Sequence, residues 1–248
     1  MVAGDPNRGY WYAYTSDSLL YNHPVIDTVR VTAVSLNPTV VAVDSALGKV
    51  LPNNGSVTVN YSLRALPGAG GDSARIVMTA PNYTPDTTMV YVQRPTLSYS
   101  YYGYPYGRIP HGTLHDNAAY FQIPYARTDT FWVVLSHTRR GIVGGPDSVA
   151  FLPGTTTQYI DLRGDSLGID TIGVARATGY VVSGAPLEFR VDRPRVQLYN
   201  YPTTLYTISA PTYVTAAVVD SLTGYAHNLL APLTVSLAVR NTAVVTLD

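Results

Sequence analysis

The 248-residue sequence has no cysteine, and it contains lysine and glutamate only once each, at Lys49 and Glu188. The absence of cysteine excludes disulfides, thiolate metal sites, iron–sulfur clusters and cysteine nucleophiles. Charged residues make up only 13%, and 16 basic residues balance 16 acidic ones. This balance argues against a nucleic-acid binder that relies on bulk charge. No apolar run approaches the roughly 20 residues that a membrane-spanning helix requires.

The N-terminal residues 1–5 contain neither a basic region nor an apolar region of the kind that forms a secretory signal. The sequence as it stands therefore shows no signal peptide. We nevertheless expect a location outside the cytoplasm, at the cell surface or in the periplasm, for the reasons that follow.

The composition favours β-structure. Val, Thr and Tyr, which suit a pleated and half-buried surface, are abundant, whereas the straight-chain helix formers are scarce. Eighteen prolines and 20 glycines leave little room for long helices. Alternating apolar and polar residues, typical of strands with one buried face, occur in residues 56–63, 88–92, 187–191 and 233–239. Many short strands separated by turn sequences predict an all-β sandwich or barrel architecture.

The chain also contains an internal repeat. Residues 13–44 align without a gap to residues 217–248, at a separation of 204 residues. A middle copy lies about halfway between them, since Leu63-Arg64 recurs as Leu162-Arg163 and Arg94-Pro95 recurs as Arg193-Pro194. The repeating unit is therefore close to 100 residues long.

This period predicts two complete units and part of a third. The first unit covers residues 1–97 with a tyrosine-rich N-terminal segment, the second covers 98–196, and the partial third covers 197–248. Half a β-sandwich would expose its inner face and an unpaired edge. We therefore expect that more protein follows residue 248, although cleavage of the mature chain at this point would give the same ending.

The repeat resembles the bacterial immunoglobulin-like repeats that occur in tandem on surface and other extracytoplasmic proteins. The resemblance rests on the pattern Asn-x-x-Val-Val-x-Val/Leu-Asp at residues 37–44 and 241–248, and on a later Ala-x-x-Tyr then Val-x-Val pattern at 80–92 and 177–191. It implies tandem immunoglobulin-like Greek-key β-sandwiches with adhesive or structural work and no catalytic residues. The second unit departs from the pattern at residues 139–146, which leaves that loop in question.

Twenty-one tyrosines are present, and they concentrate near the predicted unit boundaries. The rings either pack between neighbouring units or form a contact surface, because tyrosine combines a large apolar area with a polar tip. Stacking on sugars is a third reading, but carbohydrate sites usually add carboxylates, and none lies within residues 99–106. The candidate interface residues are Tyr10, Trp11, Tyr12, Tyr14, Tyr99, Tyr101, Tyr102, Tyr104, Tyr106, Tyr199, Tyr201 and Tyr206.

Signatures of catalysis are missing from the sequence. It has no Gly-x-Ser-x-Gly elbow, phosphate-binding loop or His-Glu-x-x-His motif. His111, His115 and Asp116 form the only cluster of metal-ligand residue types, but a His-x-x-x-His spacing in a loop is more typical of a plain polar loop. We therefore predict no enzymatic activity, no catalytic residues, no bound metal and no cofactor.

The leading hypothesis is a non-enzymatic structural or interaction protein. It would be a rod of immunoglobulin-like domains that contacts other protein subunits outside the cytoplasm, as in a surface layer, a filament or an adhesin. One alternative is an extrinsic subunit that braces the periplasmic face of a membrane complex, such as a photosynthetic reaction-centre and antenna assembly. A second alternative is a carbohydrate-binding accessory module, with a glycan as partner. No nucleic acid and no membrane-spanning segment are expected.

Overall fold

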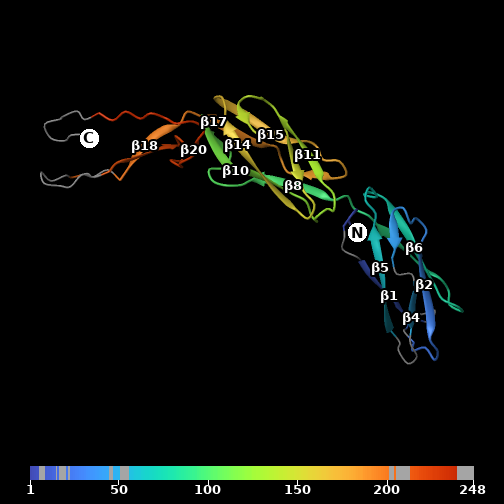
Figure 1. Ribbon diagram of the computed structural model, residues 1–248. Coiled ribbons are helices and arrows are strands. Elements are labelled where there is room, and N and C mark those ends of the chain that lie inside the picture. The colour runs from blue at the N-terminus through green and yellow to red at the C-terminus, as the bar shows by residue number, and fades with distance from the viewer. Residues whose placement is uncertain are drawn as a thin grey trace.

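The computed structural model is all-β, as the composition predicts (Figure 1). In the part of the chain that it describes, no helix is long and apolar enough to cross a membrane. The described residues are 1–5, 9–14, 16, 21, 23–44, 47–50, 56–200, 204 and 213–238, with the backbone alone for 9–14, 47–50 and 56–61.

The first half of the chain forms two antiparallel sheets that enclose one hydrophobic core. The first sheet has the strand order β1 (Gly9–Tyr14), β5 (Ser56–Ala65), β3 (Val41–Val43). The second has the order β4 (Leu47–Val50), β2 (Val29–Ser35), β6 (Ser73–Thr79), β7 (Asp86–Tyr91). Both sheets contribute buried side chains to the core, among them Val31, Val41, Leu63, Ile76 and Val90. We call this part the N-terminal sandwich.

A second pair of sheets, the middle sandwich, follows it. One sheet has the order β12 (Val143–Gly144), β14 (Thr157–Gly164), β10 (Thr113–Gln122), β8 (Thr96–Tyr101), β16 (Val181–Ser183). The other has the order β13 (Ser148–Phe151), β11 (Phe131–His137), β15 (Gly168–Arg176), β17 (Leu187–Asp192), β9 (Arg108–Pro110). Their facing surfaces bury Leu97, Phe121, Phe151, Leu162 and Phe189 almost completely.

The two sandwiches repeat the same strand order. The sheet β1-β5-β3 corresponds to β10-β14-β12, and the sheet β4-β2-β6-β7 corresponds to β13-β11-β15-β17. The two hydrophobic cores separate between Val92 and Leu97. The exact limits of the units and their Greek-key immunoglobulin class stay predictions.

The loop where the second repeat departs from the sequence pattern shares one backbone hydrogen bond with the first. The amide of Val40 donates to the carbonyl of Asn37, and the amide of Ile142 donates in the same way to the carbonyl of Arg139. The course of the turn nevertheless differs, because Gly141 has a φ of 92° whereas its counterpart Thr39 is not in the positive-φ region, and the amide of Val41 also donates to the carbonyl of Asn37.

The backbone amide that opens this turn finds a different acceptor in each sandwich. In the N-terminal sandwich the amide of Asn37 bonds the hydroxyl of Ser35 at 3.3 Å. In the middle sandwich the amide of Arg139 bonds the carboxylate of Asp170 at 2.8 Å. Asp170 is fully buried and also accepts hydrogen bonds from Thr138 and from Nδ1 of His137. The buried carboxylate of Asp170 thus accepts the turn amide in the middle sandwich, as the hydroxyl of Ser35 does in the N-terminal sandwich.

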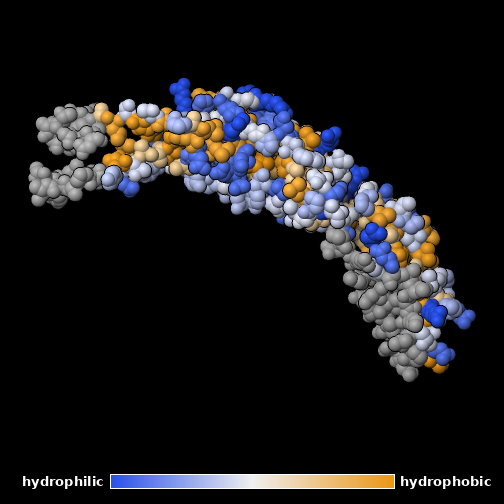
Figure 2. Space-filling view, viewed as in Figure 1, coloured by the Kyte–Doolittle hydropathy of each residue, from blue (hydrophilic) through white to orange (hydrophobic). Residues whose placement is uncertain are grey.

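The C-terminal segment begins with an antiparallel pair, β18 (Arg195–Tyr199) and β19 (Thr215–Val219), and reaches β20 (Asn228–Leu229), which pairs with β10. Figure 1 shows this pair leaving the end of the middle sandwich. Figure 2 shows hydrophobic residues gathered where it leaves, in keeping with the 43% exposure of Val196 and 38% of Leu198. The repeat copy at residues 241–248 lies outside the described residues.

Candidate interaction surface

Tyr99 and Tyr101 belong to the core of the middle sandwich rather than to an exposed surface. Tyr99 is 7% exposed, and its ring stacks on Phe121 at 5.5 Å between centroids. Tyr101 packs edge-on against Phe189 and donates its hydroxyl to the carbonyl of Glu188. Burial raises the pKa of both phenols. Both residues alternate inward on β8, which explains why these two rings are covered.

The following tyrosines are exposed because the chain leaves the sheet after β8. Tyr102, Tyr104 and Tyr106 are 46%, 54% and 64% exposed. Gly103 and Gly107 hold this loop in the left-handed region, with φ of 74° and 66°. A Cβ at Gly107 would lie 2.7 Å from the carbonyl oxygen of Glu188, so the close approach requires glycine.

Three further tyrosines contact them, two at Tyr102 and one at Tyr104, and we call these two groups of rings together the tyrosine surface. Tyr120 on β10 and Tyr159 on β14 are direct cross-strand partners on the outer face of their sheet. Tyr225 comes from the C-terminal segment and lies 5.7 Å from Tyr104. The tyrosine surface consists of Tyr102, Tyr104, Tyr106, Tyr120, Tyr159 and Tyr225.

The rings of the tyrosine surface are steeply inclined to one another. Tyr102 meets Tyr159 at 4.7 Å with an angle of 62° between the ring planes, and meets Tyr120 at 82°. Tyr104 meets Tyr106 at 84° and Tyr225 at 79°. Edge-to-face contact is a favoured geometry for aromatic pairs, and tyrosine is enriched among the residues that dominate binding at protein interfaces.

Among the other predicted interface residues, the structure describes the side chain of Tyr199 alone, beyond Tyr99 and Tyr101. Tyr199 is half-buried on β18. Of Tyr10, Trp11, Tyr12 and Tyr14 only the strand backbone of β1 is described, and Tyr201 and Tyr206 lie outside the described residues. Sequence reasoning missed Tyr120, Tyr159 and Tyr225. Alternation around Tyr159, between Gln158 and Ile160, would have placed its ring on the outer face.

The N-terminal and middle sandwiches meet at a first joint built around Tyr125. This residue is 7% exposed and donates its hydroxyl to the carbonyl of Ala3. Burial, with a smaller effect of neighbouring Tyr180, raises the pKa of Tyr125 to about 12. A cavity of about 440 Å³ lies beside it, and here the guanidinium of Arg127 makes two hydrogen bonds to Asp129.

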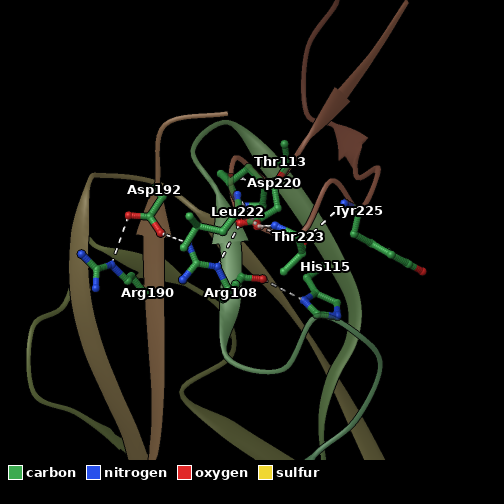
Figure 3. A network of polar contacts seen from close by, with 10 residues as sticks. Arg108, Thr113, His115, Arg190, Asp192, Asp220, Leu222, Thr223 and Tyr225 are labelled. Atoms are coloured by element: carbon green, nitrogen blue, oxygen red, sulfur yellow. Dashed lines mark hydrogen bonds and ion pairs between the residues drawn. The ribbon is translucent and has the colours of Figure 1, made fainter. Parts of the chain in front are cut away.

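The middle sandwich and the C-terminal segment meet at a second joint, which is polar (Figure 3). Arg108 on β9 lies between two carboxylates, bonding Asp192 on β17 and Asp220 at 3.1 Å. Asp220 is 1% exposed and also accepts bonds from the backbone amides of Leu222 and Thr223. Burial alone would raise the pKa of Asp220, but these hydrogen bonds together hold it below its usual value.

Two histidines pack against each other at the second joint. His115 and His227 lie 5.5 Å apart between ring centroids, and Nδ1 of His115 lies 3.3 Å from the carbonyl of Arg108. Burial lowers the pKa of both, that of His227 to about 4, where neighbouring His115 adds to the effect. Both rings are therefore uncharged at neutral pH, which suits an aromatic contact.

The histidine cluster of the sequence is not brought together as a metal site. His115 is buried whereas His111 is exposed, and the partner of His115 is His227, more than a hundred residues away along the chain. Across the residues that the structure describes, no group of three potential ligands could hold a metal ion.

Comparison with known proteins gives only distant similarities. No family model matches the sequence, and no curated protein matches it. Solved structures similar to the chain include domains 1–6 of the surface layer protein SbsC, with a TM-score of 0.35 and 14% identity over 81% of this chain and 24% of that one. Domains 4–9 of SbsC match with a TM-score of 0.32 and 15% identity over 82% and 29%.

A glycosyl hydrolase family 2 member from Bacteroides cellulosilyticus matches with a TM-score of 0.27 and 13% identity, over 72% of this chain and 26% of that one. The chain thus spans about a quarter of the length of these proteins. At such scores the comparisons carry no argument about function, which rests on the residues of this chain.

Proposed function

We propose that this protein is a non-enzymatic structural component, a rod of immunoglobulin-like sandwiches that makes protein–protein contacts outside the cytoplasm. The observation that carries the proposal is the tyrosine surface. Five of its six rings are between 46% and 64% exposed, and the rings contact one another in two groups, one around Tyr102 and one around Tyr104. Clustered exposed aromatics are the residues that dominate binding energy at protein interfaces.

The joints support the rod part of the proposal. At the first joint Tyr125 is tied to the backbone of the preceding sandwich. At the second joint Arg108 and Asp220 form a partly buried ion pair, and β20 pairs with Thr113 and Leu114 at the start of β10. Units tied at several points hold a fixed orientation better than units on a free linker. Such stiffness suits a structural element such as a surface layer or a filament.

The partner we favour is a second copy of the chain. The chain carries no net charge, so copies do not repel one another. The tyrosine surface also spans the second joint, because Tyr225 comes from the C-terminal segment. A partner that covers it would fix the middle sandwich and that segment together.

Sedimentation velocity over a range of concentrations tests this proposal. The triple variant Tyr104→Ser, Tyr106→Ser, Tyr159→Ser removes three exposed rings of the tyrosine surface, and the wild type should associate more strongly than this variant. A matched control replaces three exposed tyrosines elsewhere, at Tyr83, Tyr91 and Tyr213, which are 40%, 70% and 89% exposed. The control should associate like the wild type. A wild type that stays monomeric at all concentrations, or a control that loses association equally, would reject self-assembly through this surface.

A further inference from the structure

A second cavity, of about 720 Å³, lies at the second joint. Its walls come from the turn after β11, the start of β15, the end of β17 and Ser221 of the C-terminal segment. Three arginines line it, namely Arg139, Arg190 and Arg193. This is a local concentration of positive charge in a chain whose total charge is zero.

The carboxylate in this cavity is already engaged. Asp192 accepts a bond from Arg108 and a bond at 3.1 Å from Nε of Arg190, as Figure 3 shows. Arg190 therefore uses one of its five N–H groups for Asp192 and keeps the others. Within the described residues, neither Arg139 nor Arg193 has an ion-pair partner, and both are exposed. The cavity thus carries more guanidinium groups than its own acid can neutralise.

The first joint provides an internal comparison. The repeat equivalent of Arg193 is Arg94, which lines the first cavity and donates its Nε to the carbonyl of Gly70. The other arginine there, Arg127, is bound by Asp129. Both arginines of the first cavity therefore have a hydrogen-bond acceptor, whereas Arg139 and Arg193 of the second have no side-chain partner among the described residues.

We propose that this second cavity binds an oxyanion, a phosphate or carboxylate group carried by a ligand. The planar guanidinium donates two parallel hydrogen bonds to either group, and charge-assisted bonds of this kind are among the stronger ones available. Arg139 and Arg193 supply the two unpaired guanidiniums, and Ser221 supplies a hydroxyl from across the joint. A bound anion would therefore contact both the middle sandwich and the C-terminal segment.

The test titrates the full chain with inorganic phosphate and, separately, with succinate, at constant ionic strength set with chloride. Binding is followed by chemical shifts of the backbone amides of Leu167, Gly168 and Ile169, which line the cavity. The variant Arg139→Ser, Arg193→Ser should raise the dissociation constant about a hundredfold or more, since each lost charge-assisted bond is worth about tenfold or more.

A matched control replaces two exposed arginines elsewhere, Arg75→Ser and Arg176→Ser, which changes the net charge by the same amount. This control should bind like the wild type. Saturation by phosphate alone identifies a phosphoryl ligand, saturation by succinate alone identifies a carboxylate ligand, and both together support the shared chemistry. The proposal is overturned if neither anion gives a saturable shift, or if the control variant weakens binding as much as the cavity variant.

Discussion

Removal of the Asp170 carboxylate tests the account of the middle sandwich at its most buried polar group. Asp170 is fully buried, and its oxygens receive the amide of Arg139 at 2.8 Å, the hydroxyl of Thr138 at 3.1 Å and Nδ1 of His137 at 2.7 Å. The His137 side chain is itself only 4% exposed. The variant Asp170→Ala would leave these donors without an acceptor.

The expected cost follows from that geometry. An unsatisfied buried donor costs about 1–3 kcal/mol. The exposed Thr138 can turn its hydroxyl to water. Two buried donors, the Arg139 amide and the His137 ring, therefore account for the loss of stability. Part of this loss is offset because the variant no longer buries a charged carboxylate, which has a desolvation penalty. We therefore expect Asp170→Ala to lower the free energy of unfolding of the middle sandwich by about 3 kcal/mol.

The N-terminal sandwich suggests the control. There the equivalents of His137 and Asp170 are Ser35 and Ala74, and the Ser35 hydroxyl accepts the turn amide. The double variant His137→Ser, Asp170→Ala copies that solution into the middle sandwich. Because it supplies an acceptor to the Arg139 amide and removes the His137 donor, it should recover at least half of the lost stability.

The assay is urea unfolding followed by tryptophan fluorescence in a Trp11→Phe background, so that Trp132 on β11 alone reports on the middle sandwich. Burial alone would raise the pKa of Asp170, but its hydrogen bonds together lower it below the usual 3.8. The advantage of wild type over Asp170→Ala should therefore be complete above that ordinary value and disappear as the pH falls through the lowered pKa. A cost below about 1 kcal/mol, or a double variant no better than the single one, would refute the reasoning.

Three further predictions follow from the joints and from the tyrosine loop. Tyr125→Phe removes the hydroxyl bond to Ala3 and should speed hydrogen exchange of the Ala3 amide several-fold, since a hydrogen bond contributes about 1 kcal/mol. Folding lowers the pKa of His227 from 6.5 to about 4. Between pH 6.5 and pH 4 this histidine therefore binds a proton more readily in the unfolded chain than in the folded one. The second joint should therefore weaken as the pH falls from 7 to 4, a slope that His227→Asn should lack when exchange of the β20 amides is measured. Gly107→Ala, at φ 66° and close to the Glu188 carbonyl, should lower the melting temperature by several degrees, the equivalent of about 1–3 kcal/mol.

The sequence predicts the all-β class because alternation and turn residues are local properties. The strands β5 and β17 begin at the first residues of the alternating runs 56–63 and 187–191, and the buried positions on β17 are Leu187, Phe189 and Val191, the ones that alternation indicates. Local patterns are enough for these two strands because one face of each must be buried, whereas the alternating residues 233–238 form no strand in the structure.

The tyrosine surface was predictable only in part, because it depends on contacts across the sheet and across the joint. Sequence clustering grouped Tyr99 with Tyr104, yet one ring is in the core and the other is exposed. The contacts of Tyr159 with Tyr102 and of His227 with His115 join residues far apart in the chain. Such long-range pairs leave no periodic signal in a single sequence.

The central claim is that the tyrosine surface is a protein contact site, and hydroxyl-radical footprinting tests it most directly. Tyrosine oxidation is measured by mass spectrometry for the protein at low and at high concentration. The account predicts that Tyr104, Tyr106 and Tyr159 become protected at high concentration, whereas Tyr91 and Tyr213, exposed elsewhere, keep their reactivity. Equal reactivity of all five tyrosines at both concentrations would contradict it.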